Sequence, residues 1–417
     1  MADDPPFMNT IDRLPVTIKG GHDSVLIDQD DSIYVDLWGD EGVSSLGYKV
    51  EFNTALQEFI NNGSPQRLPD MYHNDLRKQA ATVLTKRAGF DRVFFCNSGA
   101  EANETAIKLA RRYWHKNRLG HHRKWVLTLN GNFHGRTGFA LSASDSSDSP
   151  YHKLGFGDMA PCFGVIDDDL DINHVRVWDG DKYVGYANIA PELRWSEVAA
   201  IIMAPILGNN TVKTYPSEFW AKLQHLRGIC GVLVIFDEVQ VGMGRTGAFC
   251  AHHNGEVTCG FRPDILCLGK GIAMGLPAAA VLADTHVASA FEPGVHFSTF
   301  GGSMIVCHMM LWLMRWLDRN IEHVCNCGDY LRGAFQKLKA AGVIEQFDGA
   351  GVHWGFTPTY HNCMEFCEAA RANGILLVTH RKHAPIRFTP PLNTPLDTLI
   401  FCIDAIEKTH KQLTQKP

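Results

Sequence analysis

Hydrophobic and polar positions follow two periodicities through the middle of the chain, and together they predict an α/β fold. Short unbroken apolar runs are typical of strands buried on both faces. They occur at VFF (93–95), VLTL (126–129), AAIIMA (199–204), VLVIF (232–236), DILCL (264–268) and AAAVLA (278–283). Residues 100–116 and 217–228 carry apolar side chains at helical spacing, with Ser217 as a candidate N-cap. Strands that alternate with helices predict a parallel sheet with helical crossovers.

The pattern becomes mainly helical after Gly302. Helical periodicity covers residues 303–318, 329–341, 362–373 and 396–413. Near the start, DSVLIDQDDSIYVDL (23–37) predicts a hairpin. We therefore expect three parts: an N-terminal segment (1–45) that packs with the small domain, a large domain (46–300), and a small α+β domain (301–417).

Composition narrows the class of protein. The chain has 417 residues, of which 45% are hydrophobic and 20% charged, as in an ordinary globular protein. The formal net charge of −6 gives no global attraction to nucleic acid or anionic membranes. The most apolar run, 304–317, is interrupted by His308 and Arg315 and is too short to span a bilayer.

Cysteine usage and the N-terminus suggest a compartment. The twelve cysteines include no C-x-x-C pair, which argues against a zinc site or a disulfide scaffold. The start, MADDPPF, is acidic and shows no apolar signal segment. We expect reduced thiols in a cytoplasmic protein that binds no metal.

One lysine stands between glycines in an otherwise apolar stretch, LCLGKGIAMG (266–275). A buried, unpaired ammonium group is costly, so a lysine buried there tends to lose its proton. The neutral amine is a nucleophile that forms a Schiff base with an aldehyde. Lys270 is thus a candidate nucleophile, and a surface lysine in a glycine-rich loop is the alternative.

A candidate phosphate site follows the strand VFF, at CNSGAEANE (96–104). Ser98 and Glu101 have the S-x-x-E spacing of a capping box, which predicts that a helix begins here. The free backbone N–H groups and the positive dipole end of a helix bind phosphate well. An ordinary capped turn is the alternative.

A third motif is VLVIFDEVQVGMGRTG (232–247). Asp237 ends an apolar strand, at the sheet edge where α/β proteins bind ligands. Asp237 and Glu238 are adjacent, so on a strand they point to opposite faces and do not form an acid–base pair. Gly242, Gly244 and Gly247 fit G-x-G-x-x-G, but no helical pattern follows, so a nicotinamide oxidoreductase is not favoured.

Together the three motifs suit pyridoxal phosphate. The lysine would bind the aldehyde of the cofactor, and the helix N-terminus would bind its phosphate. The aspartate would pair with the protonated ring nitrogen, so that the ring can accept the electron pair of a broken bond.

With these motifs, the sequence resembles the class III, or ornithine-type, aminotransferases of the fold-type-I pyridoxal phosphate enzymes. FFCNSGAEANETAIKLAR, GNFHGRT, IFDEVQVGMGRTG, PDILCLGKGIAMGLPAAAV and FSTFGG occur in family order. The resemblance implies a large domain with a mainly parallel seven-stranded sheet and a smaller α+β domain. It also implies a transaminase of amino-acid-like substrates and a homodimer with composite active sites.

The resemblance implies a role for each matching residue. Lys270 would form the Schiff base and move a proton, and Asp237 would hold the ring nitrogen. The remaining assignments are Ser98, Gly99, Ala100 and the partner's Thr299 for the phosphate, Phe133 and Val239 for the two ring faces, Gln240 for the ring hydroxyl, and Arg387 for a substrate carboxylate. Core packing is the alternative for Phe133 and Val239, and a structural ion pair for Arg387.

Two stretches depart from the expected pattern. The family commonly has Glu-Pro-x-x-Gly-Glu where this chain has Ala204-Pro-Ile-Leu-Gly-Asn209. In ornithine-like members the second glutamate masks the carboxylate-binding arginine, and Asn209 cannot do so. We therefore expect an open Arg387 and an α-amino acid substrate. Decarboxylation of the dialkylglycine decarboxylase type is the alternative, with an amino acid that is free or attached to a larger molecule such as a nucleotide.

The second departure is a basic, aromatic stretch at 107–125 that contains no acid. Its cations are Lys108, Arg111, Arg112, Lys116, Arg118, Arg123 and Lys124. Such a patch could bind a polyanion such as nucleic acid. A solvated helix face is the favoured interpretation.

Overall fold

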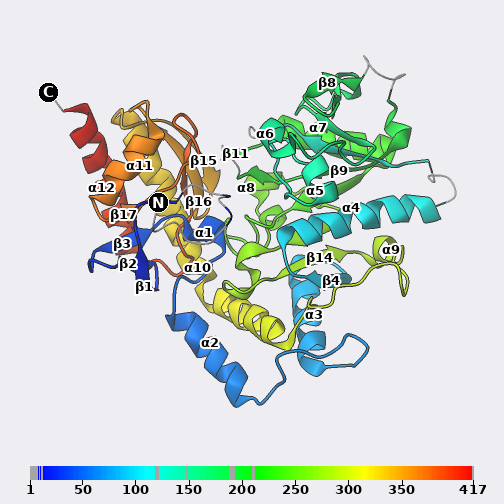
Figure 1. Cartoon of the computed structure of the whole chain (residues 1–417), viewed down its shortest axis with the longest axis horizontal. Coiled ribbons are helices and arrows are strands. Elements are labelled where there is room, and N and C mark those ends of the chain that lie inside the picture. Colours follow the sequence, from blue (N-terminus) through cyan, green and yellow to red (C-terminus); the bar gives the residue numbers. More distant parts are fainter. Residues whose placement is uncertain are drawn as a thin grey trace.

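The computed structural model describes residues 8, 10, 13–117, 122–146, 149–186, 193–208 and 212–415 (Figure 1). Its largest sheet has nine strands. In spatial order they are β4 (Arg92–Cys96), β14 (Ala279–Ala283), β13 (Ile265–Leu268), β12 (Leu233–Asp237), β9 (Val198–Met203), β5 (Trp125–Leu129), β6 (Phe163–Ile166), β7 (Arg176–Trp178) and β8 (Tyr183–Gly185).

The six predicted apolar runs all lie in this sheet, which confirms the α/β fold. Strands β13, β12, β9, β5 and β6 pair in parallel, whereas β14 is antiparallel to both of its neighbours. The expected count of seven strands was too low, because the antiparallel hairpin β7–β8 extends the sheet beyond β6. These strands are three residues each, too short for a periodic signal, and they cover an edge that would otherwise be unpaired.

Helices of this part flank the sheet in Figure 1. They are α3 (Asp75–Ala88), α4 (Gly99–Lys116), α5 (Gly138–Ser142), α6 (Ser149–Lys153), α7 (Ser217–Cys230), α8 (Gly255–Thr258) and α9 (Thr285–Ala288). Ser217 is the first residue of α7 and not its N-cap, because Pro216 occupies that position. The helix ends at Gly231, whose φ of 65° is easy only for glycine.

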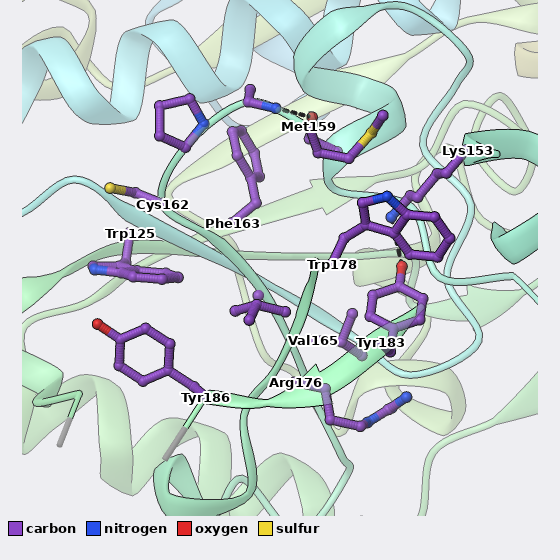
Figure 2. Close-up of a pocket in the computed structure, with 15 residues that line it drawn as sticks. Trp125, Lys153, Met159, Cys162, Phe163, Val165, Arg176, Trp178, Tyr183 and Tyr186 are labelled. Carbon is purple, nitrogen blue, oxygen red and sulfur yellow. Dashed lines mark hydrogen bonds between the residues drawn. The ribbon is translucent and has the colours of Figure 1, made fainter. Parts of the chain in front are cut away.

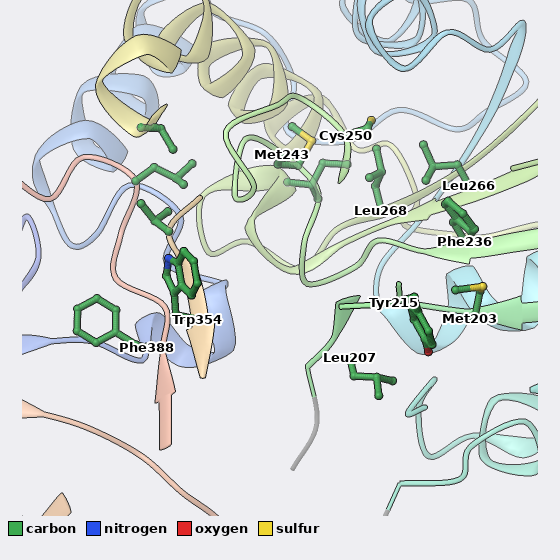
Figure 3. Close-up of a cluster of buried hydrophobic side chains, with 14 of the residues drawn as sticks. Met203, Leu207, Tyr215, Phe236, Met243, Cys250, Leu266, Leu268, Trp354 and Phe388 are labelled. Carbon is green, nitrogen blue, oxygen red and sulfur yellow. The ribbon is translucent and has the colours of Figure 1, made fainter. Parts of the chain in front are cut away.

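The buried core continues from the large sheet into the second part of the chain. Figure 3 shows Phe236 and Leu266 on the sheet side, and Trp354 and Phe388 on the other side of the same cluster. All four side chains are buried.

The second part contains two small sheets. One joins β1 (Ile18–His22), β2 (Val25–Asp28), β3 (Ile33–Asp36) and β17 (Ile375–Leu376), and the other joins β15 (Ile344–Ala350), β16 (His353–Pro358) and β18 (Ile386–Phe388). The predicted hairpin is β2–β3, and β3 pairs in parallel with β17. A short pair, β10 (Ile206–Leu207) with β11 (Lys213–Thr214), forms a separate sheet, and the Thr214 backbone N–H donates to Asp348 of β15 at 2.9 Å.

The helices of this part are α1 (Gly39–Gly42), α2 (Val50–Asn61), α10 (Met304–Ala340), α11 (Cys363–Arg371) and α12 (Leu396–Thr414). We expected two helices where α10 runs unbroken for 37 residues. The apolar face continues through the polar interval, since Val324 and Cys327 are buried there. Gly328 lets the backbone of residue 351 approach closely, because a Cβ at position 328 would lie 2.8 Å from the Gly351 Cα. No helix among the described residues is long and apolar enough to cross a membrane.

Candidate active site

The three sequence motifs meet at one edge of the large sheet. Strands β4, β12 and β13 run in the same direction, so the turns after Cys96, Asp237 and Leu268 lie at their carboxyl ends. The Val239 side chain lies between the turn after Cys96 and the turn after Leu268. A Cβ on Gly99 would lie 2.7 Å from Val239 Cγ1, and a Cβ on Gly269 would lie 3.0 Å from it. Glycine at both positions therefore lets the lysine turn and the phosphate turn approach the same side chain.

The predicted helix start is confirmed at Ser98. Its Oγ accepts a hydrogen bond of 3.2 Å from the Glu101 backbone N–H and caps α4. The Glu101 carboxylate reaches back one residue further than in a capping box and accepts from the Asn97 N–H at 3.0 Å. Gly99 and Ala100 form the first turn of an 18-residue helix, where backbone N–H groups lack intrahelical acceptors.

Asp237 is buried among hydrogen-bond donors. Its Oδ2 accepts from Asn103 Nδ2 at 2.7 Å and lies 2.8 Å from His134 Nδ1. Its Oδ1 accepts from the Val239 N–H at 3.1 Å. Sequence reasoning missed both side-chain partners, although Asn103 stands in AEANE and His134 in GNFHGRT, two of the motifs that carried the resemblance.

Glu238 points away from this site, as the strand alternation predicts. Its carboxylate accepts from the backbone N–H groups of Ala251 (2.5 Å) and His252 (3.0 Å), and His252 Nδ1 lies 2.8 Å from it. Residues 242–247 form turns and not a helix start, in agreement with the argument against a dinucleotide site.

Lys270 is placed by an unusual backbone. Its φ is +46°, directly after Gly269, and such left-handed residues concentrate at functional sites. The side chain is 23% exposed, and Nζ donates a hydrogen bond of 2.7 Å to Glu41 Oε2. We expected an unpaired, buried amine. That expectation was wrong, because a carboxylate 229 positions earlier balances the ammonium charge.

The same carboxylate holds Arg387. The Arg387 side chain is 4% exposed, and its Nη1 donates to Glu41 Oε1 at 2.9 Å. The nearby charges of Lys270 and then Arg387 hold the pKa of Glu41 well below its usual value, although burial opposes them. The expectation of an open Arg387 was therefore wrong, because a glutamate from the N-terminal segment pairs with it. Asn209, on which that expectation rested, lies outside the described residues.

The remaining predicted residues lie around these groups. Gln240 Nε2 donates to the Glu41 carbonyl at 3.3 Å. The Phe133 ring lies under the Arg136 guanidinium, with 5.2 Å between the guanidinium carbon and the ring centroid. Thr299 is exposed, and its carbonyl accepts from Arg67 Nε at 2.8 Å. The cofactor contacts expected of these residues stay predictions.

Several cations of the basic stretch at 107–125 make ion pairs and other contacts within the chain. Arg112 and Lys116 pair with Glu292, at 3.3 and 2.6 Å. The Arg111 guanidinium lies 4.5 Å from the Phe163 ring centroid and donates to the Pro161 carbonyl at 3.0 Å. Arg118 lies outside the described residues. These contacts argue against a polyanion site, and they show that this helix face is partly packed within the chain and not solvated throughout, as the favoured interpretation had it.

A cavity of about 150 Å³ lies away from the candidate site, beside β6, β7 and β8 (Figure 2). Lys153 is fully buried beside it and donates to the Ser144 carbonyl at 2.7 Å and to the Tyr183 hydroxyl. Burial lowers the pKa of Lys153 to about 8. The residues that line this cavity include none of the predicted site residues.

Comparison with known proteins places the chain in a family. The family model described as aminotransferase class-III matches residues 7–409. The acetylornithine aminotransferase of Aquifex aeolicus is 33% identical over 93% of this chain and 94% of its own length. That of Methanopyrus kandleri is 35% identical over 84% of this chain and 82% of its own. The ornithine aminotransferase structure from Toxoplasma gondii ME49 superposes with a TM-score of 0.83 at 26% identity, covering 98% and 93% of the two chains.

The chain belongs to the class-III aminotransferases. It is a pyridoxal-phosphate-dependent transaminase of the fold-type-I class that acts on an amino-acid-like substrate. The residues at the sheet edge fit the cofactor: a lysine amine, a buried carboxylate and a capped helix N-terminus meet around Val239, where glycines at 99 and 269 leave no Cβ in the way.

Proposed function

We propose that the enzyme exchanges an amino group between a donor amino acid and a 2-oxo acid, with Arg387 as the carboxylate receptor. One observation carries this proposal. A single carboxylate, that of Glu41, contacts both Arg387 Nη1 and Lys270 Nζ. A substrate carboxylate bound to Arg387 would therefore place its neighbouring carbon beside the Lys270 amine. That arrangement suits 2-oxo acids and α-amino acids.

The names of the relatives suggest the amino donor. Proteins named acetylornithine aminotransferase resemble this chain over nearly its whole length. We infer that N-acetylornithine, or a compound with the same remote amine and α-carboxylate, is the donor. A 2-oxo acid then accepts the amino group.

The roles of the chain's own residues follow from their positions. When bound, pyridoxal phosphate supplies an aldehyde that links to amines and a ring that takes up the electron pair of a broken bond. Lys270 would hold the cofactor and then carry a proton to and from the substrate carbon. Asp237, held by Asn103 and His134, would keep the ring nitrogen protonated. Ser98, Gly99 and Ala100 would bind the phosphate at the start of α4.

We further propose that the protein works as a homodimer. Phe297 and Phe300 are 65% and 68% exposed and flank Thr299, the residue expected to reach a partner's phosphate. Met71 and Tyr72 are also largely exposed. The Arg67 contact with the Thr299 carbonyl brings these two exposed segments close together, and apolar side chains that gather into one exposed patch are typical of an interface. We also propose a cytoplasmic location, because the spacing of the twelve cysteines in the sequence is not that of a disulfide scaffold.

The test is product analysis with the cofactor-loaded enzyme. N-acetylornithine and 2-oxoglutarate should yield glutamate and the corresponding aldehyde in equal amounts, without carbon dioxide. Release of carbon dioxide in proportion to the amino acid consumed would favour decarboxylation instead. No glutamate from any donor in a panel of amino acids would overturn the proposal.

A further inference from the structure

Three side chains that can bind a metal lie together outside the candidate active site. They are Cys250, His252 and His253, and one potential ligand atom from each lies within 4.8 Å of the other two. Cys250 and His252 are buried, whereas His253 is exposed to solvent. A thiolate and two imidazoles form a donor set that suits zinc. None of the three residues has a role in the proposed function.

The backbone that carries these side chains is held by hydrogen bonds to other parts of the chain. The Glu238 carboxylate accepts from the backbone N–H groups of Ala251 and His252. Directly after the three residues, Asn254 Nδ2 donates to the Thr246 carbonyl at 2.9 Å. Because the segment is already fixed in the folded chain, little conformational freedom would be lost when its side chains bind one ion.

The Glu238 carboxylate also orients one of the two imidazoles. His252 Nδ1 lies 2.8 Å from Glu238 Oε1. A carboxylate only accepts hydrogen bonds, so Nδ1 carries the proton, and in the neutral ring Nε2 has the lone pair that a metal needs. Histidines that bind metals in proteins typically donate their other N–H to a carboxylate in this way, which fixes the tautomer and the orientation of the ring.

The buried charge of Glu238 favours a cation at this place. Glu238 is fully buried, and among the described residues its ion-pair partner is His252 and not a lysine or an arginine. Histidine is a cation only when both ring nitrogens are protonated. A neutral His252 therefore leaves a buried carboxylate without a counter-charge, which is costly. The two positive charges of a divalent ion would balance the Glu238 carboxylate and a Cys250 thiolate.

We propose that Cys250, His252 and His253 form a zinc site, with water as the fourth ligand. Rotation of the side chains would bring the three ligand atoms to separations of about 3.5 Å, as in a tetrahedral zinc site. The Cys250 thiol would release its proton to solvent as the zinc–sulfur bond forms. We expected no metal because the chain has no C-x-x-C pair. A zinc site with an open position needs only three protein ligands, and the spacing C-x-H-H supplies them.

The test measures zinc binding by the reduced, cofactor-loaded enzyme. The protein is dialysed against zinc buffered with nitrilotriacetate, and the bound zinc is measured by mass spectrometry. The wild type should hold about one zinc ion per chain with one sulfur ligand at about 2.3 Å, as X-ray absorption at the zinc edge would show. A sulfur ligand distinguishes this site from zinc bound to the cofactor phosphate, which has oxygen ligands only.

The matched variants are His253→Gln and Cys259→Ser. His253 is exposed, so its replacement should leave the fold intact and weaken zinc binding at least about tenfold. Cys259 is an exposed thiol outside the cluster, and its replacement should leave zinc affinity unchanged. Zinc should raise the melting temperature of the wild type and of Cys259→Ser but not that of His253→Gln. No retained zinc in the wild type, zinc without a sulfur ligand, or unchanged affinity in His253→Gln would overturn the proposal.

Discussion

His134 Nδ1 lies 2.8 Å from the Oδ2 atom of Asp237, and both side chains are buried. The other ring nitrogen, Nε2, lies 3.2 Å from Thr128 Oγ1. With Asn103 as the second donor to Oδ2, the carboxylate is held in one orientation at the end of β12. Fixed donors of this kind prepare a charged group for its partner before that partner binds.

Asp237→Asn should bind the cofactor and lose at least about 100-fold in kcat, equivalent to about 2.7 kcal/mol of barrier. An amide cannot hold a protonated ring nitrogen as a carboxylate does. Single-turnover kinetics with matched cofactor content measure the loss. Asp264→Asn, at another buried carboxylate at the start of β13, is the control for general effects of removing a buried charge. A kcat of Asp237→Asn within twofold of the wild type would exclude the proposed role.

The variant His134→Phe tests whether His134 positions the Asp237 carboxylate. The variant removes one donor to Asp237 and should lower kcat about tenfold, while KM for the 2-oxo acid stays within about twofold. A purely structural role would lower thermal stability and cofactor content and leave kcat per bound cofactor unchanged. Absorbance of bound cofactor and steady-state kinetics on the same preparations separate these outcomes.

Lys270→Ala should fold, because the side chain contributes little to the core and its backbone contacts are retained. It should show no visible absorbance of lysine-linked cofactor and no turnover. Circular dichroism confirms the fold, and absorbance with added pyridoxal phosphate tests the linkage. Turnover at the wild-type rate would show that another group performs the chemistry.

Because of His353, the free energy of unfolding should decrease as the pH is lowered. Burial, followed by the charges of Arg245, Arg387 and Lys270, lowers its pKa in the folded state from 6.5 to about 3. The unfolded chain therefore binds a proton below pH 6.5 that the folded chain does not. The stability contribution is complete above that pH and decreases as the pH falls toward 3. Between pH 6 and pH 4 the free energy of unfolding should drop by about 2 kcal/mol from this group.

Urea unfolding at the two pH values measures this drop, and His353→Leu is the matched variant. Within the described residues, neither ring nitrogen of His353 has a hydrogen-bond partner, so the variant leaves no partner unsatisfied. Its pH dependence should be weaker by about the same 2 kcal/mol. An equal pH dependence in both proteins would contradict a buried neutral histidine.

The proposed dimer is tested by Phe300→Asp. The side chain is 68% exposed beside Thr299, so a charge there should not disturb a single folded chain. In an interface it should weaken association and lower cofactor affinity together. Sedimentation velocity and cofactor titration measure the two effects. A fully active monomer at assay concentration would rule out composite sites.

The local sequence was sufficient to predict the strands that are buried on both faces, because burial of both faces produces an unbroken apolar run. VLVIF and DILCL read as buried strands because each is apolar on both faces, and Asp237 and Lys270 were found because they follow such strands. The direction of β14 could not be read in the same way, since an antiparallel strand inside the sheet is equally apolar. The domain boundaries at residues 45 and 300 stay a prediction.

Long-range contacts explain what the sequence did not reveal. The close approach of Gly328 in α10 to Gly351, where a Cβ would lie 2.8 Å from the Gly351 Cα, is a contact that no local periodicity encodes. Glu41 lies 229 positions from Lys270 and 346 from Arg387, so their bridge has no local signature. The motif Gly-Asp-Glu-Gly at 39–42, two acids between glycines, was the available signal for a special turn.

The central claim, amino transfer through a cofactor linked to Lys270, is tested most directly by one absorbance titration of the loaded enzyme. Adding N-acetylornithine alone should abolish the visible band in proportion to the active sites, and adding 2-oxoglutarate afterwards should restore it. This reversal requires the cofactor to keep the amino group between the two steps. A band that does not respond to any amino donor, or that returns without a 2-oxo acid while carbon dioxide is released, would contradict the account.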